Sequence, residues 1–260
     1  MFDPYNLAPP PLGVHPTTSM NFIKAHAEKT GIKIDSDHGT TTVGMHYQSG
    51  IILAADSRTT SGSYISSQSA KKIVEIGDSM LATMAGVSAD GAYWLRVLRR
   101  ECRLYELRHK ESMSATAASK ILFNICYKHR RDGLEMSILL AGPGRVKDEL
   151  ELYYVDSDVL RQKGKLFSIG SGSDSAYGLL DSEYEWELED EAAHEMVQRA
   201  LYYAAMKDAY TGGSVVVHLV TPKGCTKMSN TDLAELHEKY QYLLNGEEDT
   251  DSDPLPAPSQ

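Results

Sequence analysis

The chain has 260 residues, of which 42% are hydrophobic and 24% charged, and its formal net charge is −10. This length and apolar content predict a globular protein of one large domain or two small ones, and they exclude a disordered chain. The acidic balance argues against a nucleic-acid partner, which would require a basic patch, and no apolar run approaches the roughly 20 residues that span a membrane.

Residues 1–39 differ in composition from the rest of the chain. They contain five prolines among the first sixteen residues, show no sustained periodicity and end in Asp35-Ser36-Asp37-His38-Gly39. Composition alone fits a disordered extension as well as a removable pro-segment, and the junction with Thr40 favours the pro-segment. We therefore expect a propeptide over 1–39, one folded domain over 40–243, and an acidic, disordered tail over 244–260.

The chain from Thr40 to residue 130 predicts two pairs of strands followed by a pair of helices. Turn residues separate the strands of each pair, and the helices repeat apolar positions at spacings of three and four. Ser114 fits the N-cap of the second helix. The predicted strands are Thr40–Tyr47, Gly50–Asp56, Lys72–Ile76 and Met80–Ala85, and the predicted helices are 88–109 and 115–130.

The second half of the chain repeats this alternation of strand groups and helix groups. It is not the βαβ order of a parallel sheet. We therefore predict an α+β fold, a four-layer α/β/β/α sandwich of two antiparallel sheets flanked by helices. The predicted strands are Glu135–Gly142, Leu150–Asp156, Leu166–Gly170, Ser214–Thr221 and Thr226–Ser229, and the predicted helices are 174–181, 190–208 and Thr231–Leu243.

The three cysteines are Cys102, Cys126 and Cys225, widely spaced and without a C-x-x-C pair. This spacing predicts neither a zinc site nor a redox pair, and the first two fall on apolar helix faces, where cysteine acts as a small hydrophobe. A reducing compartment fits best. Because the N-terminus lacks the pattern of a secretory signal, we expect a soluble, intracellular protein.

The junction His38-Gly39-Thr40 joins the polar leader to the first predicted strand. A threonine hydroxyl is a poor nucleophile unless a base lies beside it, and the residue's own α-amino group can be that base. A free α-amino group has a pKa of roughly 7.7–8.0, close to what general-base work at neutral pH needs. Cleavage between Gly39 and Thr40 would therefore create nucleophile and base on one residue.

Asp56 and Lys72 follow Thr40 at intervals of sixteen residues. Each has an ordinary structural interpretation: Asp56 can cap a turn or pair with Arg58, and Lys72 is one of two adjacent lysines. Because side chains alternate along a strand, only one of Lys71 and Lys72 can point inward, and an inward lysine needs a counter-charge such as Asp56. Their joint occurrence after the Gly39–Thr40 junction favours a catalytic group.

No motif predicts a cofactor or a metal. Gly170-Ser171-Gly172-Ser173 opens like a dinucleotide loop, but the third glycine is replaced by Ser175. His194-Glu195 lacks the second histidine of H-E-x-x-H, because Gln198 occupies that position. We therefore expect neither cofactor nor metal, and a tight turn presenting hydroxyl groups at 170–173.

Many ordered segments resemble the catalytic β subunits of the 20S proteasome, within the N-terminal nucleophile hydrolases, and most of all the β5 type. The resemblance covers about Thr40 to Tyr240. The matching segments are Gly39-Thr40-Thr41-Thr42, Ala54-Ala55-Asp56-Ser57-Arg58, Tyr64-Ile65, Ser67-Gln68, Lys71-Lys72, Thr83-Met84-Ala85-Gly86, Cys102 to Arg108, Tyr153 to Ser157, Gly170 to Ser173, Asp208-Ala209-Tyr210 and Leu236 to Tyr240.

The resemblance implies the catalytic roles. Thr40 would become the N-terminal nucleophile, Lys72 would tune its hydroxyl, Asp56 would orient that lysine, and the Gly86 N–H would stabilise the oxyanion. The remaining catalytic positions implied are Ser171, Asp208 and Thr211, around the threonine amine; at Thr211 the family usually has serine.

The resemblance also implies a substrate cleft. The backbone of Thr60 would pair with an extended substrate, and Met84 would form the floor of a pocket for apolar side chains. Gly86, Ala85, Ser88 and Ala70 complete the implied substrate-binding set. Val87, Thr59 and Ser61 depart from the residues common in the family and affect fine specificity.

The resemblance implies the precursor of a β5-type threonine endopeptidase, activated by its own cleavage at Gly39-Thr40 and acting on unfolded proteins after apolar residues. Its partners would be the other α and β subunits of the 20S core particle, an unfolded polypeptide substrate and, indirectly, regulatory caps, in cytoplasm and nucleus, with no nucleic acid or membrane. Two alternatives remain: a catalytically lapsed structural subunit of the same particle, and a free-standing amidohydrolase for small amides.

Overall fold

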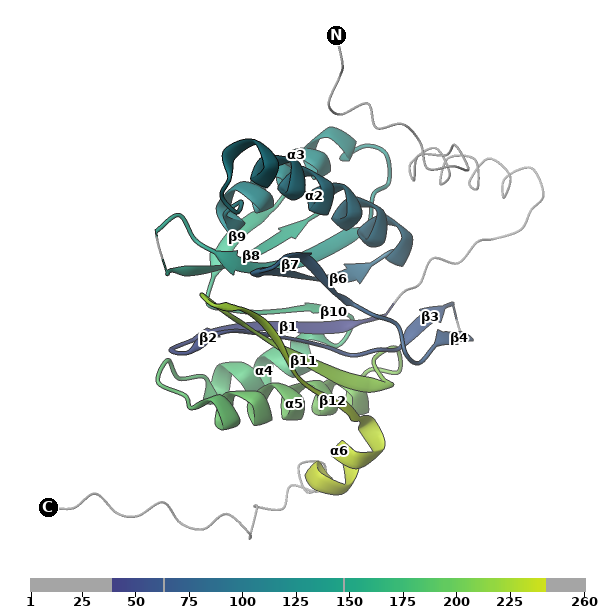
Figure 1. Cartoon of the computed structure of the whole chain (residues 1–260). Helices are drawn as coiled ribbons and strands as arrows, with labels where there is room; N and C mark the ends of the chain where they lie inside the picture. The colour runs from purple at the N-terminus through teal and green to yellow at the C-terminus, as the bar shows by residue number, and fades with distance from the viewer. Residues whose placement is uncertain (1–38, 63, 147, 242–260) are drawn as a thin grey trace, which may run out of the picture.

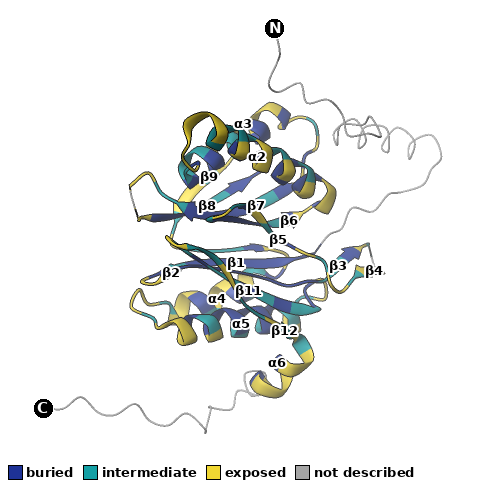
Figure 2. Cartoon of the chain, in the orientation of Figure 1, coloured by how far each residue is buried: buried dark blue, intermediate teal, exposed yellow. Residues whose placement is uncertain are grey.

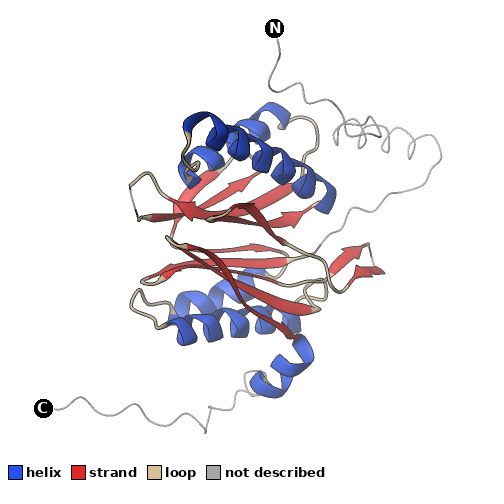
Figure 3. Ribbon diagram, viewed as in Figure 1, coloured by secondary structure: helices blue, strands red, loops and turns tan. Residues whose placement is uncertain are grey.

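The computed structural model describes residues 39–62, 64–146 and 148–241. Most of the predicted propeptide and all of the predicted tail therefore lie outside the described residues. Two β-sheets lie face to face, with α2 and α3 on one outer side and α4 and α5 on the other (Figure 1). Figure 3 shows the same order as helix, strand, strand and helix layers. The predicted four-layer α+β sandwich is confirmed.

The first five-stranded sheet contains the N-terminal strands of the domain. Its strand order is β10-β1-β2-β11-β12, with every pair antiparallel. The helices on its outer side are α4 (Ser173–Glu183), α5 (Asp190–Lys207) and α6 (Leu233–Tyr240). The strands are β1 (Thr41–Tyr47), β2 (Gly50–Ala55), β10 (Leu166–Gly170), β11 (Ser214–Thr221) and β12 (Gly224–Asp232).

The second five-stranded sheet has the order β5-β6-β7-β8-β9, again antiparallel throughout. Its outer side is covered by α2 (Ser88–His109) and α3 (Ala115–His129). A separate hairpin, β3 (Thr59–Ser61) and β4 (Tyr64–Ser67), extends from the body. The strands of the sheet are β5 (Ile73–Gly77), β6 (Met80–Gly86), β7 (Met136–Pro143), β8 (Leu150–Asp156) and β9 (Arg161–Gly164).

Apolar side chains form a buried cluster in each space between layers, and much of the two sheets is coloured as buried in Figure 2. In α2 the predicted stripe points inward: Leu95 and Leu98 are fully buried and Cys102 nearly so, whereas Arg96 faces solvent. Burying one leucine side chain contributes roughly 1.5–3 kcal/mol. Between the sheets, Leu53, Leu81 and similar residues form a separate cluster, which packs the two sheets against each other.

The structure differs from the sequence predictions at short or terminal elements. The predictions missed β3, β4 and β9, which have three or four residues each and expose many side chains. The predicted helix Thr231–Leu243 was wrong at its start, because β12 continues to Asp232. Asp232 then caps α6, since its side chain accepts a hydrogen bond from Ala234 N. None of the helices in the described ranges is long and apolar enough to cross a membrane.

Candidate active site

Thr40 lies immediately before β1 of the first sheet, and only 7% of its surface is exposed. β1 is held between β2 and β10, with Thr41 opposite Gly170. The Asp56 N–H also donates to Thr41 O at 3.1 Å. Backbone pairing on both sides therefore fixes the position of Thr40.

Asp56 and Lys72 form a buried ion pair beside this strand. Lys72 Nζ donates to Asp56 Oδ1 at 2.6 Å, and the two side chains are 6% and 1% exposed. Lys71 is exposed, so the expected opposite orientation of the two lysines is observed. Lys72 itself precedes β5, whereas the sequence prediction placed it within the strand.

Three backbone N–H groups complete the surroundings of the Asp56 carboxylate. Thr41 N lies 3.0 Å from Oδ1, and Gly212 N and Arg58 N lie 2.9 and 3.2 Å from Oδ2. Burial raises the pKa of the Asp56 carboxyl, while Lys72 and the N–H groups of Gly212 and Thr41 oppose the shift. Burial lowers the pKa of the Lys72 ammonium, against the attraction of Asp56. The arrangement therefore holds a lysine whose proton is bound less tightly than usual.

A chain of hydrogen bonds through hydroxyl groups and a carboxylate begins at the Thr40 nitrogen. Thr40 N donates to Ser171 Oγ at 3.2 Å, and Ser171 Oγ donates to Asp208 Oδ2 at 2.5 Å. Thr211 Oγ1 donates to the same oxygen at 2.6 Å. The structure thus brings together the three supporting residues that the resemblance implied, in one hydrogen-bonded group that reaches Thr40 just before β1.

Two glycines have backbones that a side chain would disrupt. Gly170 has φ +104°, and a Cβ there would lie 1.8 Å from Thr40 O. Gly86 has φ +92°, and a Cβ there would lie 2.7 Å from Glu135 O. Since L residues rarely adopt such φ values, glycine is required at both positions, and at Gly170 it permits the close approach of the Thr40 backbone.

A small pocket joins Thr40 and Lys72 to β6 and the start of α2. It encloses about 30 Å³, which is room for a water molecule. Thr60 does not line this pocket; its Oγ1 instead accepts a hydrogen bond from Gly39 N at 3.4 Å, and Thr59 contributes to the wall. The predicted catalytic and substrate-binding residues that line it are Thr40, Ala70, Lys72, Met84, Ala85, Gly86 and Ser88.

Sequence reasoning missed two contacts of the site. Thr41 Oγ1 lies 2.6 Å from Thr211 Oγ1, across 170 residues of sequence. A Cβ on Gly39 would lie 1.6 Å from Tyr210 Cβ, so Tyr210 packs directly against the last residue of the leader. No local pattern predicts either contact, because both depend on how the loop after α5 meets β1.

The chain matches the model of one protein family. The family is described as "Proteasome subunit", and the match covers residues 36–220. The chain belongs to the proteasome subunit family. In the described ranges, this proteasome subunit has no group of three or more His, Cys, Asp or Glu side chains that could hold a metal ion.

Similar proteins come from distant organisms. Proteasome subunit beta type-5 of Dictyostelium discoideum is 47% identical over 207 residues, which are 80% of this chain and 75% of the relative. The beta type-5 subunit of Gallus gallus is 46% identical over 208 residues, 78% of each chain. Proteasome subunit beta type-8 of Canis lupus familiaris is 42% identical over 236 residues, 89% of this proteasome subunit and 83% of the relative.

Proposed function

We propose that this chain is the precursor of a β5-type catalytic subunit of the 20S proteasome, a threonine endopeptidase that cleaves unfolded polypeptides after apolar residues. One observation carries the proposal: a single pocket is lined by Thr40 and Lys72, with Asp56 paired to that lysine. The similarity to beta type-5 subunits supports the same assignment.

The first reaction would be cleavage of the chain itself. Thr40 Oγ attacks the Gly39 carbonyl carbon, and its proton passes through a neighbouring base to the Thr40 nitrogen as the C–N bond breaks. The Gly39 acyl group is then an ester on Oγ, which water hydrolyses. Residues 1–39 leave with a carboxylate on Gly39, and Thr40 gains a free α-amino group. Tyr210 supports this step because it packs against Gly39.

The second reaction would be hydrolysis of a substrate peptide. The α-amino group takes the proton of Thr40 Oγ as that oxygen attacks the substrate carbonyl carbon, and Lys72 stabilises the negative charge on the oxygen. The proton then passes to the leaving amine as the peptide bond breaks, and water hydrolyses the resulting ester to release the acid and restore Thr40. An N–H of Gly86 aimed at the oxyanion would lower the barrier by about 3–4 kcal/mol. Met84, a flexible and polarizable side chain, would favour apolar residues before the cleaved bond.

The proposal includes the assembly and location of the protein. Its partners are the other α and β subunits of the 20S core particle, and regulatory caps act on it indirectly. Its reaction needs no cofactor or metal, and the particle works in cytoplasm and nucleus. A catalytically lapsed structural subunit is the second candidate, and the presence of Thr40, Asp56 and Lys72 around one site argues against it. The family match argues against the free-standing amidohydrolase.

The deciding experiment is the intact mass of the chain isolated from its assembled particle, for the unaltered chain, Thr40→Ala and Thr40→Ser. We expect a product beginning at residue 40 for the unaltered chain, a leader retained or cut elsewhere in Thr40→Ala, and cleavage at the same bond in Thr40→Ser, which keeps a hydroxyl. A leader still attached to the unaltered chain in completed particles would favour the structural subunit.

A further inference from the structure

A second, much larger cavity lies on the other side of the Asp56–Lys72 pair. It measures about 490 Å³, within the range of about 300–1,000 Å³ common for small-molecule sites. Its walls come from β5 and β12, which are edge strands of the two sheets, and from β11, which pairs with β12. The cavity therefore opens between the sheets, where the sandwich ends.

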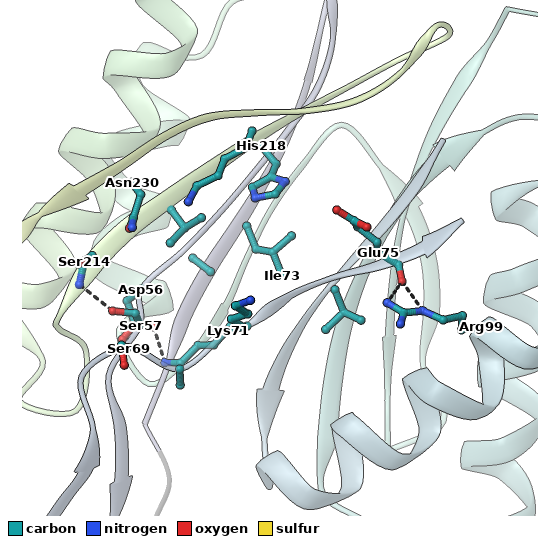
Figure 4. Close-up of a pocket in the computed structure, with 16 residues that line it drawn as sticks. Asp56, Ser57, Ser69, Lys71, Ile73, Glu75, Arg99, Ser214, His218 and Asn230 are labelled. Atoms are coloured by element: carbon teal, nitrogen blue, oxygen red, sulfur yellow. Dashed lines mark hydrogen bonds and ion pairs between the residues drawn. The ribbon is translucent and has the colours of Figure 1, made fainter. Parts of the chain in front are cut away.

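The two walls differ in their side chains, as Figure 4 shows. Ser214, His218 and Asn230 lie along one wall, and Lys71, Ile73 and Glu75 lie opposite them. Val216 adds apolar surface between Ser214 and His218, because alternate residues of β11 share a face. The cavity thus offers apolar contact together with polar and charged groups.

Positive charge predominates in this cavity although the chain as a whole is acidic. Four cationic side chains line it against two carboxylates, those of Asp56 and Glu75. Lys72 is neutralised by Asp56, and Arg99 Nε donates to the Glu75 backbone oxygen at 2.6 Å. Within the described parts of the chain, the two remaining cations, Lys71 and Lys227, have no carboxylate within 4.0 Å.

We propose that this cavity binds a small organic carboxylate with an apolar side chain. Its carboxylate would bind Lys227 and Lys71, and its apolar part would lie against Ile73 and Val216. His218 is paired with Lys227 in the β11–β12 register, so both side chains line the cavity at the end where the carboxylate would bind. An inorganic anion would leave the apolar wall unused, whereas an organic acid uses both halves of the cavity.

The position of the site predicts an effect on the proposed hydrolysis. Asp56 and Lys72 line this cavity, and Lys72 also lines the Thr40 pocket. A bound anion would offset the positive charge that Lys72 presents to Thr40, and it would do so without occupying the substrate cleft. It would therefore lower kcat and leave KM unchanged. This effect rests on the proposed function; binding itself does not.

The binding test uses assembled particles that carry Thr40→Ala, so that hydrolysis plays no part. The probe is radiolabelled N-acetyl-leucine in equilibrium dialysis, with N-acetyl-leucinamide as the competitor lacking a carboxylate. We expect saturable binding that the amide does not displace and that Lys227→Gln weakens by about fivefold or more, the loss of one charged contact. Lys223→Gln, at the turn before β12, is the matched control and should bind as the parent does.

The kinetic test uses active particles and a fluorogenic peptide, with N-acetyl-leucine as the added acid. We expect kcat to fall in the parent and in Lys223→Gln, and to fall much less in Lys227→Gln, whose activity without the acid stays unchanged. Absence of binding to the assembled particle, equal binding in both lysine variants, or purely competitive inhibition would each overturn the proposal. Binding with no hydrolysis in any particle would instead overturn the proposed function and leave the site standing.

Discussion

Lys72 Nζ and Asp56 Oδ1 lie 2.6 Å apart in the interior of the protein. Asp56 has further partners besides this lysine. Its two oxygens also accept N–H groups from Thr41, Arg58 and Gly212. One carboxylate therefore connects the start of β1, the loop after β2 and the loop before β11. Asp56 therefore holds three segments of the site together and also balances the charge of Lys72.

The two members of this pair should differ in their effect on stability. Asp56→Ala removes an acceptor from three backbone N–H groups and leaves Lys72 unpaired, so we expect a loss of about 3–5 kcal/mol in the free energy of unfolding. Lys72→Met removes one partner of a carboxylate that keeps three others, so its loss should be smaller. Urea unfolding of the leader-bearing chain measures both.

The two variants should not differ in activity as they do in stability. Both should fail to remove the leader, and assembled particles should therefore contain the leader-bearing chain in either case. An equal or smaller stability loss in Asp56→Ala than in Lys72→Met would contradict the bridging role of the carboxylate. Normal processing in Lys72→Met would contradict the role proposed for the lysine.

Gly170→Ala should damage the site through the backbone alone. The new Cβ would meet Thr40 O at 1.8 Å, and φ is +104°, so we expect a loss of stability of about 2 kcal/mol or more and a failure to remove the leader. Gly178→Ala is the matched control, because a Cβ at that exposed position of α4 would meet nothing within 4 Å. It should stabilise the chain by up to about 1 kcal/mol. Thermal unfolding and intact mass measure both outcomes.

The contact between Gly39 and Tyr210 predicts a compensating pair of substitutions. Gly39→Ala places a Cβ against Tyr210 Cβ, so leader removal should slow markedly. Tyr210→Gly in the same chain makes room and should restore part of the rate. The measurement is the fraction of processed chain over time during particle assembly. Equal rates in the single and double variants would show that the contact has no part in processing.

The thiol groups should be unreactive in the folded chain. Burial raises the pKa of Cys102 and Cys126 to about 12 and that of Cys225 to about 11. Since only the thiolate reacts, iodoacetamide at about pH 8 should modify all three slowly, Cys225 first, and leave peptide hydrolysis unchanged. Labelling followed by mass spectrometry gives the order, with the urea-unfolded chain as control. Rapid loss of activity on labelling would point to a cysteine in the chemistry.

The folded chain should lose stability as the solution becomes mildly acidic. Burial lowers the pKa of His46, His194 and His218 from their ordinary value of 6.5. Below that value the unfolded chain binds more protons than the folded chain, so the free energy of unfolding decreases as the pH falls through 6.5 toward the lowered values. Above 6.5 the three residues contribute no such dependence.

Thermal unfolding between about pH 7.5 and pH 5.5 measures this effect. His218→Gln should flatten the curve, whereas His109→Gln, at the exposed end of α2, serves as the control. A curve that keeps its slope in single variants of all three half-buried histidines would assign the acid sensitivity to other groups.

The sequence predicted the elements whose hydrophobic pattern is long enough to be distinctive. The stripe of α2 and the N-cap at Ser114 are confirmed. The β3–β4 hairpin was missed because its strands are short and expose Tyr64, which is 80% accessible, so no alternation of buried and exposed residues marks them. β9 lacks such a pattern for the same reason.

The site was predictable where chemistry restricts the residue types. A buried lysine needs a counter-charge, and this requirement, together with the Gly39–Thr40 junction, linked Lys72 to Asp56. The Thr41–Thr211 hydrogen bond and the Tyr210–Gly39 contact have no such requirement, because many residues could occupy those positions in another fold. They follow from the three-dimensional path of the loop after α5.

While Gly39 is still attached, the Thr40 nitrogen already donates a hydrogen bond to Ser171 Oγ, and Ser171 in turn donates one to Asp208. Under the proposed mechanism, activation then requires no movement of the scaffold: the latent and working enzymes differ in the bonding of one atom. An amide nitrogen there holds no available lone pair, and an amine does. Latency of this kind depends on one covalent bond, and its hydrolysis is irreversible. The cleaved chain has no inactive conformation to which it could return, so regulation must act before the cleavage or on other parts of the particle.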